Sequence, residues 1–424
     1  MNSNFKRYII FWLSQALSQL GSSMTTFALI LWTYTQKGTA MTVSLMTFFN
    51  YLPYIILSLF VGTFVDNHSK KKIMLVSDSI AAICSLAIFC LNSGNALQIW
   101  HIYLVNMIIG FMGAFQDPAS DVALGKVVPK EKLEQISGMN SFSDNLVAVL
   151  SPVFAASLFA FGGLKLILII DLLSFLFAFL ILLFVLRIPD DIPQKAEKKS
   201  VFIGCKEGLQ YLKQHNGIFL VIITMAVLNF FSRLTYENIL SPMILSRSAN
   251  DSVTLGIVNA VMGIGGIIGG IIVSSGKIKA NSAKMIYLSA MLSFLLGDIM
   301  MGLGRNGIVW SLAGLAASLP IPFINAGQMV ILYRNVPEDM KGRIFAVRNA
   351  VQFSSIPLGI LLGGLLADYV FEPFMLTQNP ITQVLHKLVG EGAGSGMAVM
   401  FLCTGILGSL FSFAFYQRKD IRNL

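Results

Sequence analysis

Twelve long apolar stretches run through this chain of 424 residues. Each is close to or longer than the ~20 residues that an α-helix needs to cross the hydrocarbon core of a membrane. They predict transmembrane helices over residues 8–34, 42–65, 73–92, 98–120, 136–161, 164–186, 218–245, 253–275, 285–303, 308–332, 344–370 and 397–416. Apolar residues make up 55% of the chain and charged residues only 12%, which is too few to cover a soluble domain. The sequence therefore predicts an all-α membrane protein.

Lysine and arginine are distributed unequally over the predicted loops. When both termini lie on one side of the membrane, that side receives 24 of the 30 lysine and arginine residues. Positively charged loops remain in the cytoplasm, so we expect a multi-pass protein of the bacterial plasma (inner) membrane with both termini cytoplasmic. The same asymmetry accounts for the net charge of +9, and no nucleic-acid partner is expected. The four cysteines lack metal-ligand spacing, so we expect no metal site.

The chain resembles itself at an offset of 208 residues. Gly62 matches Gly270, and the Val-Pro pair that ends at Pro129 matches the pair that ends at Pro337. Six predicted helices separate the matched positions, and an even number preserves the direction of the chain, so the repeat is parallel. The sequence therefore predicts twelve transmembrane helices in two pseudo-symmetric six-helix bundles around a central cavity.

The repeat also defines three regions of the chain. We expect an N-terminal six-helix bundle over residues 1–187, a cytoplasmic linker over 188–216 and a C-terminal six-helix bundle over 217–424. Apolar residues at helical spacing in the linker predict one amphipathic helix with a face formed by Phe202, Cys205, Leu209 and Leu212. Two placements fit this helix: on anionic lipid headgroups, or in water as part of a tether.

The predicted loop after the second helix carries a glycine, an acid four residues later and then a basic cluster: Gly62, Asp66, Lys70 and Lys71. This spacing resembles the loop motif of the major facilitator superfamily, which implies a role in cytoplasmic gating. A merely positive loop would explain the lysines but not the spacing of Gly62 and Asp66. In the second half the acid is replaced by Ser274, so the resemblance implies a latch in one half only.

Two further blocks, residues 115–133 and 335–343, resemble the macrolide-efflux and siderophore-exporter branch of that superfamily. The resemblance covers nearly the whole chain. It implies the major facilitator fold and export of amphipathic small molecules, macrolide-, siderophore- or peptide-like, by alternating access with proton antiport. Three features depart from the branch: the efflux motif around Pro152 is degenerate, Ile109 and Gly110 stand near the usual arginine of helix 4, and the loop over 372–396 is longer.

Other classes of function remain as alternatives. An importer or facilitator would have the same fold, and the sequence separates it from an exporter only through the motif around Pro152. A membrane enzyme or receptor is less favoured, because the four histidines are scattered and form no catalytic or metal-binding cluster. We therefore expect no enzyme activity and no cofactor, with the proton gradient as energy source, and a monomer whose partners are protons, a small-molecule substrate and the lipid bilayer.

Ionisable side chains inside predicted spans are costly unless they are paired, hydrated or functional. Asp144 lies among polar residues of the fifth helix and is the first candidate for proton coupling, with a structural hydrogen bond as the alternative. Arg233 and Glu237 are spaced to share a helix face, so they either form a structural ion pair or exchange partners during transport. Asp171 is a further candidate, although its apolar neighbours favour packing.

Polar side chains inside the spans indicate a substrate cavity. The first helix has a polar stripe at helical spacing, and exposure of these polar side chains to lipid would be unfavourable. The cavity candidates are polar or aromatic residues from both halves: Gln15, Ser18, Gln19, Ser22, Asn140, Asn229, Tyr236, Gln328 and Gln352. The 208-residue offset places Gln352 at the position equivalent to Asp144. At this position we therefore expect a titratable side chain in the first half of the chain and a neutral one in the second.

Overall fold

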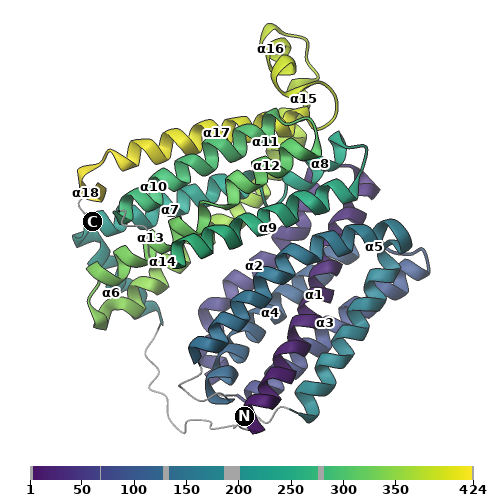
Figure 1. The fold of residues 1–424 in the computed structure, drawn as a ribbon, viewed down its shortest axis with the longest axis vertical. Coiled ribbons are helices and arrows are strands. Elements are labelled where there is room, and N and C mark those ends of the chain that lie inside the picture. The colour runs from purple at the N-terminus through teal and green to yellow at the C-terminus, as the bar shows by residue number, and fades with distance from the viewer. Residues whose placement is uncertain (1–2, 67, 128–132, 186–200, 276–280, 423–424) are drawn as a thin grey trace. The chain divides into compact units, whose positions relative to one another are not determined.

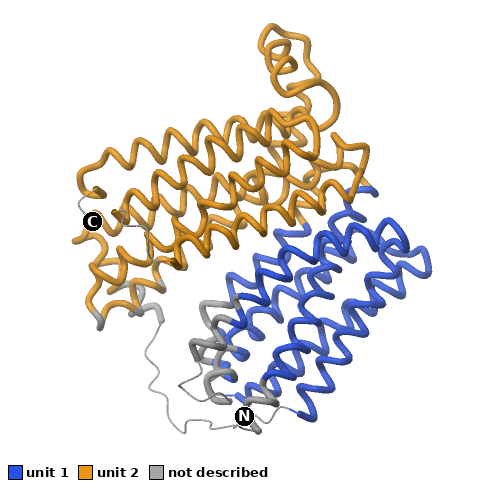
Figure 2. Tube along the Cα trace, viewed as in Figure 1, with its two compact units in different colours: residues 1–36, 46–198 blue, residues 37–45, 199–424 orange. Residues whose placement is uncertain are grey.

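The computed structural model describes residues 3–66, 68–127, 133–185, 201–275 and 281–422. Throughout these ranges the regular structure is helical, and they contain no strand. The chain divides into two compact units, which Figure 2 shows in blue and orange. The N-terminal unit comprises residues 1–36 and 46–198, and the C-terminal unit comprises residues 37–45 and 199–424.

Five helices run through the N-terminal part of the chain (Figure 1): α1 (Ser3–Lys37), α2 (Ala40–Asp66), α3 (Lys70–Ser93), α4 (Ile99–Val127) and α5 (Leu133–Phe184). The long α5 breaks at Gly163, whose φ of 61° is a conformation that glycine adopts at little cost. It therefore contains two of the predicted spans. Small and aliphatic side chains such as Val61, Met74, Ala119 and Leu182 fill the core of this unit.

The C-terminal unit contains the linker helix and shorter, interrupted helices: α6 (Val201–Gln214), α7 (Asn216–Thr235), α8 (Leu240–Arg247), α9 (Ser252–Ser274), α10 (Ser282–Leu292), η2 (Ser293–Asp298), α11 (Ile299–Leu303), α12 (Gly307–Ser318), α13 (Ile321–Asn335), α14 (Glu338–Leu366), η3 (Ala367–Phe371), α15 (Glu372–Met375), α16 (Pro380–Val389), α17 (Ser395–Tyr416) and α18 (Lys419–Arg422). Pro320 stands where α12 gives way to α13, because proline lacks the N–H that a continuous helix needs. The buried side chains of Tyr287, Phe294 and Ile331 lie in its core.

The membrane character of the chain is evident from its helices. Among the described residues, ten helical segments are long and apolar enough to cross a membrane. One of them, Phe142–Phe184, covers two predicted spans, and α1, which carries the polar stripe, is not among the ten. The twelve predicted spans are therefore compatible with the structure. Large apolar side chains such as Phe161, Leu173 and Ile308 are exposed, as expected of surfaces that contact lipid.

The linker helix α6 packs against the C-terminal unit. Leu212 is fully buried in a cluster with Leu332 and Ile344. The hydroxyl of Tyr211 donates a hydrogen bond to the carbonyl of Asn335, 3.3 Å away. Leu212 of the predicted apolar face therefore contacts the C-terminal unit, whereas Leu209 of the same face is 38% exposed. The part of the linker over residues 186–200 lies outside the described residues.

The first turn of α2 also belongs to the C-terminal unit. The backbone N–H groups of Ala40 and Met41 donate to the carboxyl group of Asp368, at 3.1 and 2.7 Å. A carboxylate at this position satisfies N–H groups that have no partner within the helix and complements the helix dipole. The side-chain amide of Asn238 donates to the hydroxyl of Ser44 at 2.6 Å. These contacts explain why residues 37–45 cluster with the second half of the chain.

Candidate substrate and proton site

The N-terminal unit contains a cavity of about 580 Å³. Its lining mixes polar and aromatic side chains from four helices: Phe11, Trp12, Gln15, Ala16, Gln19, Tyr54, Gln116, Asp117, Ser120, Asn140, Ser143 and Asp144. Four of the residues predicted from the sequence, Gln15, Gln19, Asn140 and Asp144, therefore meet at one place. Such a mixture of aromatic surface and a few polar groups suits an amphipathic small molecule.

Asp144 on α5 lies in the wall of this cavity with its side chain exposed. The side-chain amide of Gln19 on α1 donates a hydrogen bond of 3.1 Å to the Oδ1 atom of Asp144. The polar stripe of α1 places Gln15 and Gln19 one turn apart, so both reach the same cavity. The Asp144 carboxyl group is thus hydrogen-bonded and also accessible to water or a ligand.

A second carboxyl group in the cavity, that of Asp117 on α4, is absent from the residues predicted from the sequence. The hydroxyl of Tyr54 on α2 donates to its Oδ2 atom at 3.0 Å. The neighbouring residue Gln116 donates from its side-chain amide to Asp78 on α3, also at 3.0 Å. Asp117 precedes Pro118 near the end of a predicted span, and that placement of an acid inside a span was the available signal.

Asp171 lies away from this cavity lining and is buried. Three hydroxyl groups donate to its carboxyl oxygens: Ser22 at 3.0 Å, Thr25 at 3.0 Å and Ser85 at 2.9 Å. These residues line a separate, smaller cavity of about 90 Å³. The polar stripe of α1 therefore serves two different carboxyl groups, Asp144 through Gln19 and Asp171 through Ser22 and Thr25. Ser18, another predicted cavity residue on α1, is partly buried.

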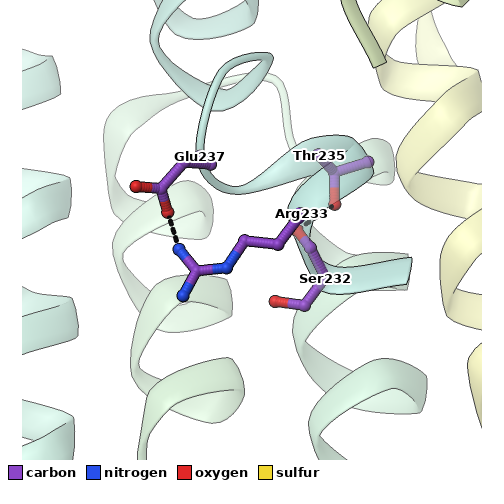
Figure 3. Close-up of polar contacts among 4 residues, drawn as sticks. All are labelled: Ser232, Arg233, Thr235 and Glu237. Atoms are coloured by element: carbon purple, nitrogen blue, oxygen red, sulfur yellow. Dashed lines mark hydrogen bonds and ion pairs between the residues drawn. The ribbon is translucent and has the colours of Figure 1, made fainter. Parts of the chain in front are cut away.

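In the C-terminal unit, Arg233 and Glu237 form the ion pair that their spacing predicts (Figure 3). Arg233 lies in the last turn of α7 and Glu237 in the turn that follows the helix. Both side chains are partly exposed. The pair therefore combines a charge-assisted contact with partial exposure of both side chains.

The other predicted residues of the C-terminal unit are buried or partly buried. Gln328 and Gln352 are 4% and 8% exposed, and their amide nitrogens have no hydrogen-bond partner within the described residues. The hydroxyl of Tyr236 is buried as well, near the carboxyl group of Asp298. Asn229 is partly buried. Asp144 is exposed in its cavity whereas the equivalent Gln352 is buried, so the two halves differ in burial as well as in charge.

The lysines of the loop motif lie at the start of α3 in the N-terminal unit. Lys70 is buried, and the ammonium group of Lys71 donates to the carbonyl of Leu183 at 2.9 Å. Ser69 caps the N-terminus of α3 by accepting from the N–H of Lys72. Gly62 and Asp66 belong to the last turns of α2, and the side chain of Asp66 lies outside the described part of the structure.

Helices long and apolar enough to cross a membrane, in two units with a polar cavity in one of them, are typical of a multi-pass membrane transporter. Residues 11–360 match the Major Facilitator Superfamily, and the chain belongs to that family of transporters and is not an enzyme.

Curated relatives are similar over most of the chain. Macrolide efflux protein A of Streptococcus pyogenes is 27% identical over 375 residues, which cover 87% of this chain and 91% of the relative. The enterobactin exporter EntS of Shigella boydii is 25% identical over 320 residues, 72% of each chain. The staphyloferrin A transporter of Staphylococcus aureus is 23% identical over 369 residues, 84% of this chain and 89% of the relative. The relatives thus include efflux proteins, as the sequence motifs predict.

Solved structures show the same fold. A bacterial homologue of the human lysosomal transporter Spinster superposes with a TM-score of 0.71 at 13% identity and covers 98% of both chains. A bacterial homologue of the iron transporter ferroportin gives a TM-score of 0.67 at 15% identity over 98% of this chain and 99% of the other. The predicted major facilitator fold is therefore confirmed.

Proposed function

We propose that this transporter exports amphipathic small molecules, macrolide-, siderophore- or peptide-like, by alternating access coupled to proton antiport. The observation that carries the proposal is the cavity of the N-terminal unit, where two carboxyl groups, Asp117 and Asp144, stand beside Phe11, Trp12 and Tyr54. Aromatic rings offer surface for the apolar part of such a molecule, and the amides and carboxyl groups offer hydrogen bonds or charge. The names of the efflux relatives support the direction.

In this proposal Asp144 binds the transported proton. Its carboxyl group accepts a hydrogen bond from Gln19 and is exposed in the cavity. Alternating access changes the water around the carboxyl group, so the same residue can take up a proton on one side and release it on the other. A bound substrate that donates to Asp144 replaces the proton, which yields antiport.

Proteoliposomes in which the cytoplasmic face of the transporter points outward test this function. Radiolabelled erythromycin supplied outside should accumulate when the lumen is made acidic, because protons leave the lumen as the drug enters it. Collapse of the gradient with a protonophore should reduce the uptake rate about tenfold or more, since coupling then supplies no driving force. Uptake that does not respond to the gradient contradicts antiport, and uptake driven only by an alkaline lumen indicates symport.

The orientation of the transporter in the membrane and its function as a single chain belong to the same proposal. The transporter lies in the bacterial plasma membrane with both termini cytoplasmic, and one chain suffices, with the proton gradient as energy source and no cofactor. The distribution of lysine and arginine supports the orientation. Protease treatment of spheroplasts tests it: affinity tags on both ends should survive until the cells are lysed, and early loss of either tag contradicts the topology.

A further inference from the structure

The segment between η3 and α17 forms a small helical protrusion at one end of the C-terminal unit. Figure 1 shows α15 and α16 at the end of α17 that lies away from the C-terminus, with α16 projecting to the side of α17 instead of extending its axis. We propose that α16 lies on the membrane surface, with its apolar side chains inserted at the boundary between the lipid headgroups and the acyl chains. The proposal rests on the membrane location of the chain and not on its substrate.

The helix α16 is a defined element with both ends fixed. Asn379 and Thr382 form a reciprocal capping box at its start, which is typical of a stable helix N-terminus. Gly390, with a φ of 91°, ends it. Arg305 donates to the carbonyls of Lys387 at 2.8 Å and Leu388 at 3.4 Å.

A second arginine secures the same end of the helix. Arg247 donates to the carbonyl of Val389, so two guanidinium groups meet the carbonyls at the end of α16. Cations at this end also complement the helix dipole. The carboxyl group of Glu372 accepts from the N–H of Met397 at 2.9 Å and holds the start of the protrusion against α17. The helix is therefore anchored to the unit, and its orientation is set by these contacts.

Three different faces run along α16. Thr382 and Val389 are completely buried and face the protein. An apolar stripe is exposed on the second face, with Ile381 63%, Val384 58% and Leu388 47% exposed. Gln383 and Lys387 are exposed on the third. At about 100° per residue these faces lie roughly a third of a turn apart, which gives a helix in the membrane plane one side for protein, one for lipid and one for water.

Further apolar side chains are exposed in the segment that leads to α16. Tyr369 and Val370 of η3 are exposed near the end of a membrane-crossing segment, and Leu376 after α15 is 83% exposed. Tyrosine is enriched at the level of the headgroups. The bilayer is therefore the partner that this stripe fits, because the stripe lies near the end of a membrane-crossing segment.

Site-directed spin labelling of the full chain tests the proposal. The native cysteines are first replaced, and a single cysteine is introduced as Val384→Cys or Leu388→Cys on the apolar stripe, or as Gln383→Cys or Lys387→Cys on the polar face. Each variant is placed in nanodiscs of phosphatidylethanolamine and phosphatidylglycerol that hold one chain. Collision of the label with oxygen, which concentrates in lipid, is compared with collision with a water-soluble nickel chelate.

The ratio of oxygen to nickel collisions should be about fivefold or more higher at positions 384 and 388 than at 383 and 387. Ile381→Cys provides a second position on the stripe if one variant fails to fold. Equal nickel access at all positions would overturn the proposal. Protection of the stripe that appears only in discs holding two chains would also overturn it, because a second copy would then be the partner. Neither result bears on transport, so the outcome is independent of the proposed function.

Discussion

The side-chain amide of Gln19 on α1 donates a 3.1 Å hydrogen bond to the carboxyl group of Asp144 on α5. This contact joins the polar stripe of the first helix to an acid exposed in a cavity of about 580 Å³. The Asp144 side chain is exposed, whereas the Asp171 side chain is buried and accepts hydrogen bonds from three hydroxyl groups. The two carboxyl groups therefore lead to different predictions.

Replacement of Asp171 should affect stability more than coupling. Asp171→Ala leaves the hydroxyls of Ser22, Thr25 and Ser85 without their acceptor and should lower the free energy of unfolding by about 1–3 kcal/mol. Asp171→Asn keeps one acceptor oxygen and should cost less. Thermal unfolding in detergent measures both. If Asp171→Asn folds normally and abolishes gradient-driven uptake, Asp171 has a role in proton coupling, which would contradict this prediction.

Tyr54 should act on substrate binding through Asp117. Tyr54→Phe removes the hydroxyl that donates to Asp117 but keeps the aromatic ring. A hydrogen bond of this kind contributes about 0.5–1.5 kcal/mol, so KM for export should rise about two- to tenfold with a smaller change in the maximal rate. Initial uptake rates at varied substrate concentration provide the measurement. An unchanged KM would place the substrate away from this part of the cavity.

The ion pair of Arg233 and Glu237 allows a charge-swap experiment. Arg233→Ala leaves a partly buried carboxylate without its cation and should lower the free energy of unfolding by about 1–3 kcal/mol. The double change Arg233→Glu with Glu237→Arg restores opposite charges at the same spacing and should recover most of that loss. Melting temperatures of the single and double variants decide the matter. Failure of the swap to recover stability would mean that other neighbours of Arg233 dominate.

The docking of α6 on the C-terminal unit yields a matched pair of substitutions. Leu212 is fully buried, whereas Leu209 in the same helix is 38% exposed. Leu212→Ala should destabilise the protein by about 2–4 kcal/mol, and Leu209→Ala by clearly less. Thermal unfolding of the two variants compares them directly. Equal effects would indicate that α6 does not pack through Leu212.

The sequence predicted the spans well because length and hydropathy alone define a membrane-crossing helix. It predicted the neighbours of those helices less well. The stripe of α1 has a clear helical period, but the period does not tell that Gln19 meets Asp144 while Ser22 meets Asp171. The position of Asp117 inside a span can be read from the sequence, but its contact with Tyr54 on another helix cannot.

The most direct test of the account is a measurement of protons and substrate together. Proteoliposomes with the cytoplasmic face outward are loaded with a pH-sensitive dye, and erythromycin is added outside without an imposed pH gradient. We predict that the lumen becomes alkaline as the drug enters, and that Asp144→Asn abolishes this change while Asp144→Glu retains it. Drug entry with an unchanged or acidified lumen in the native protein, or an undiminished pH change with Asp144→Asn, would contradict the account.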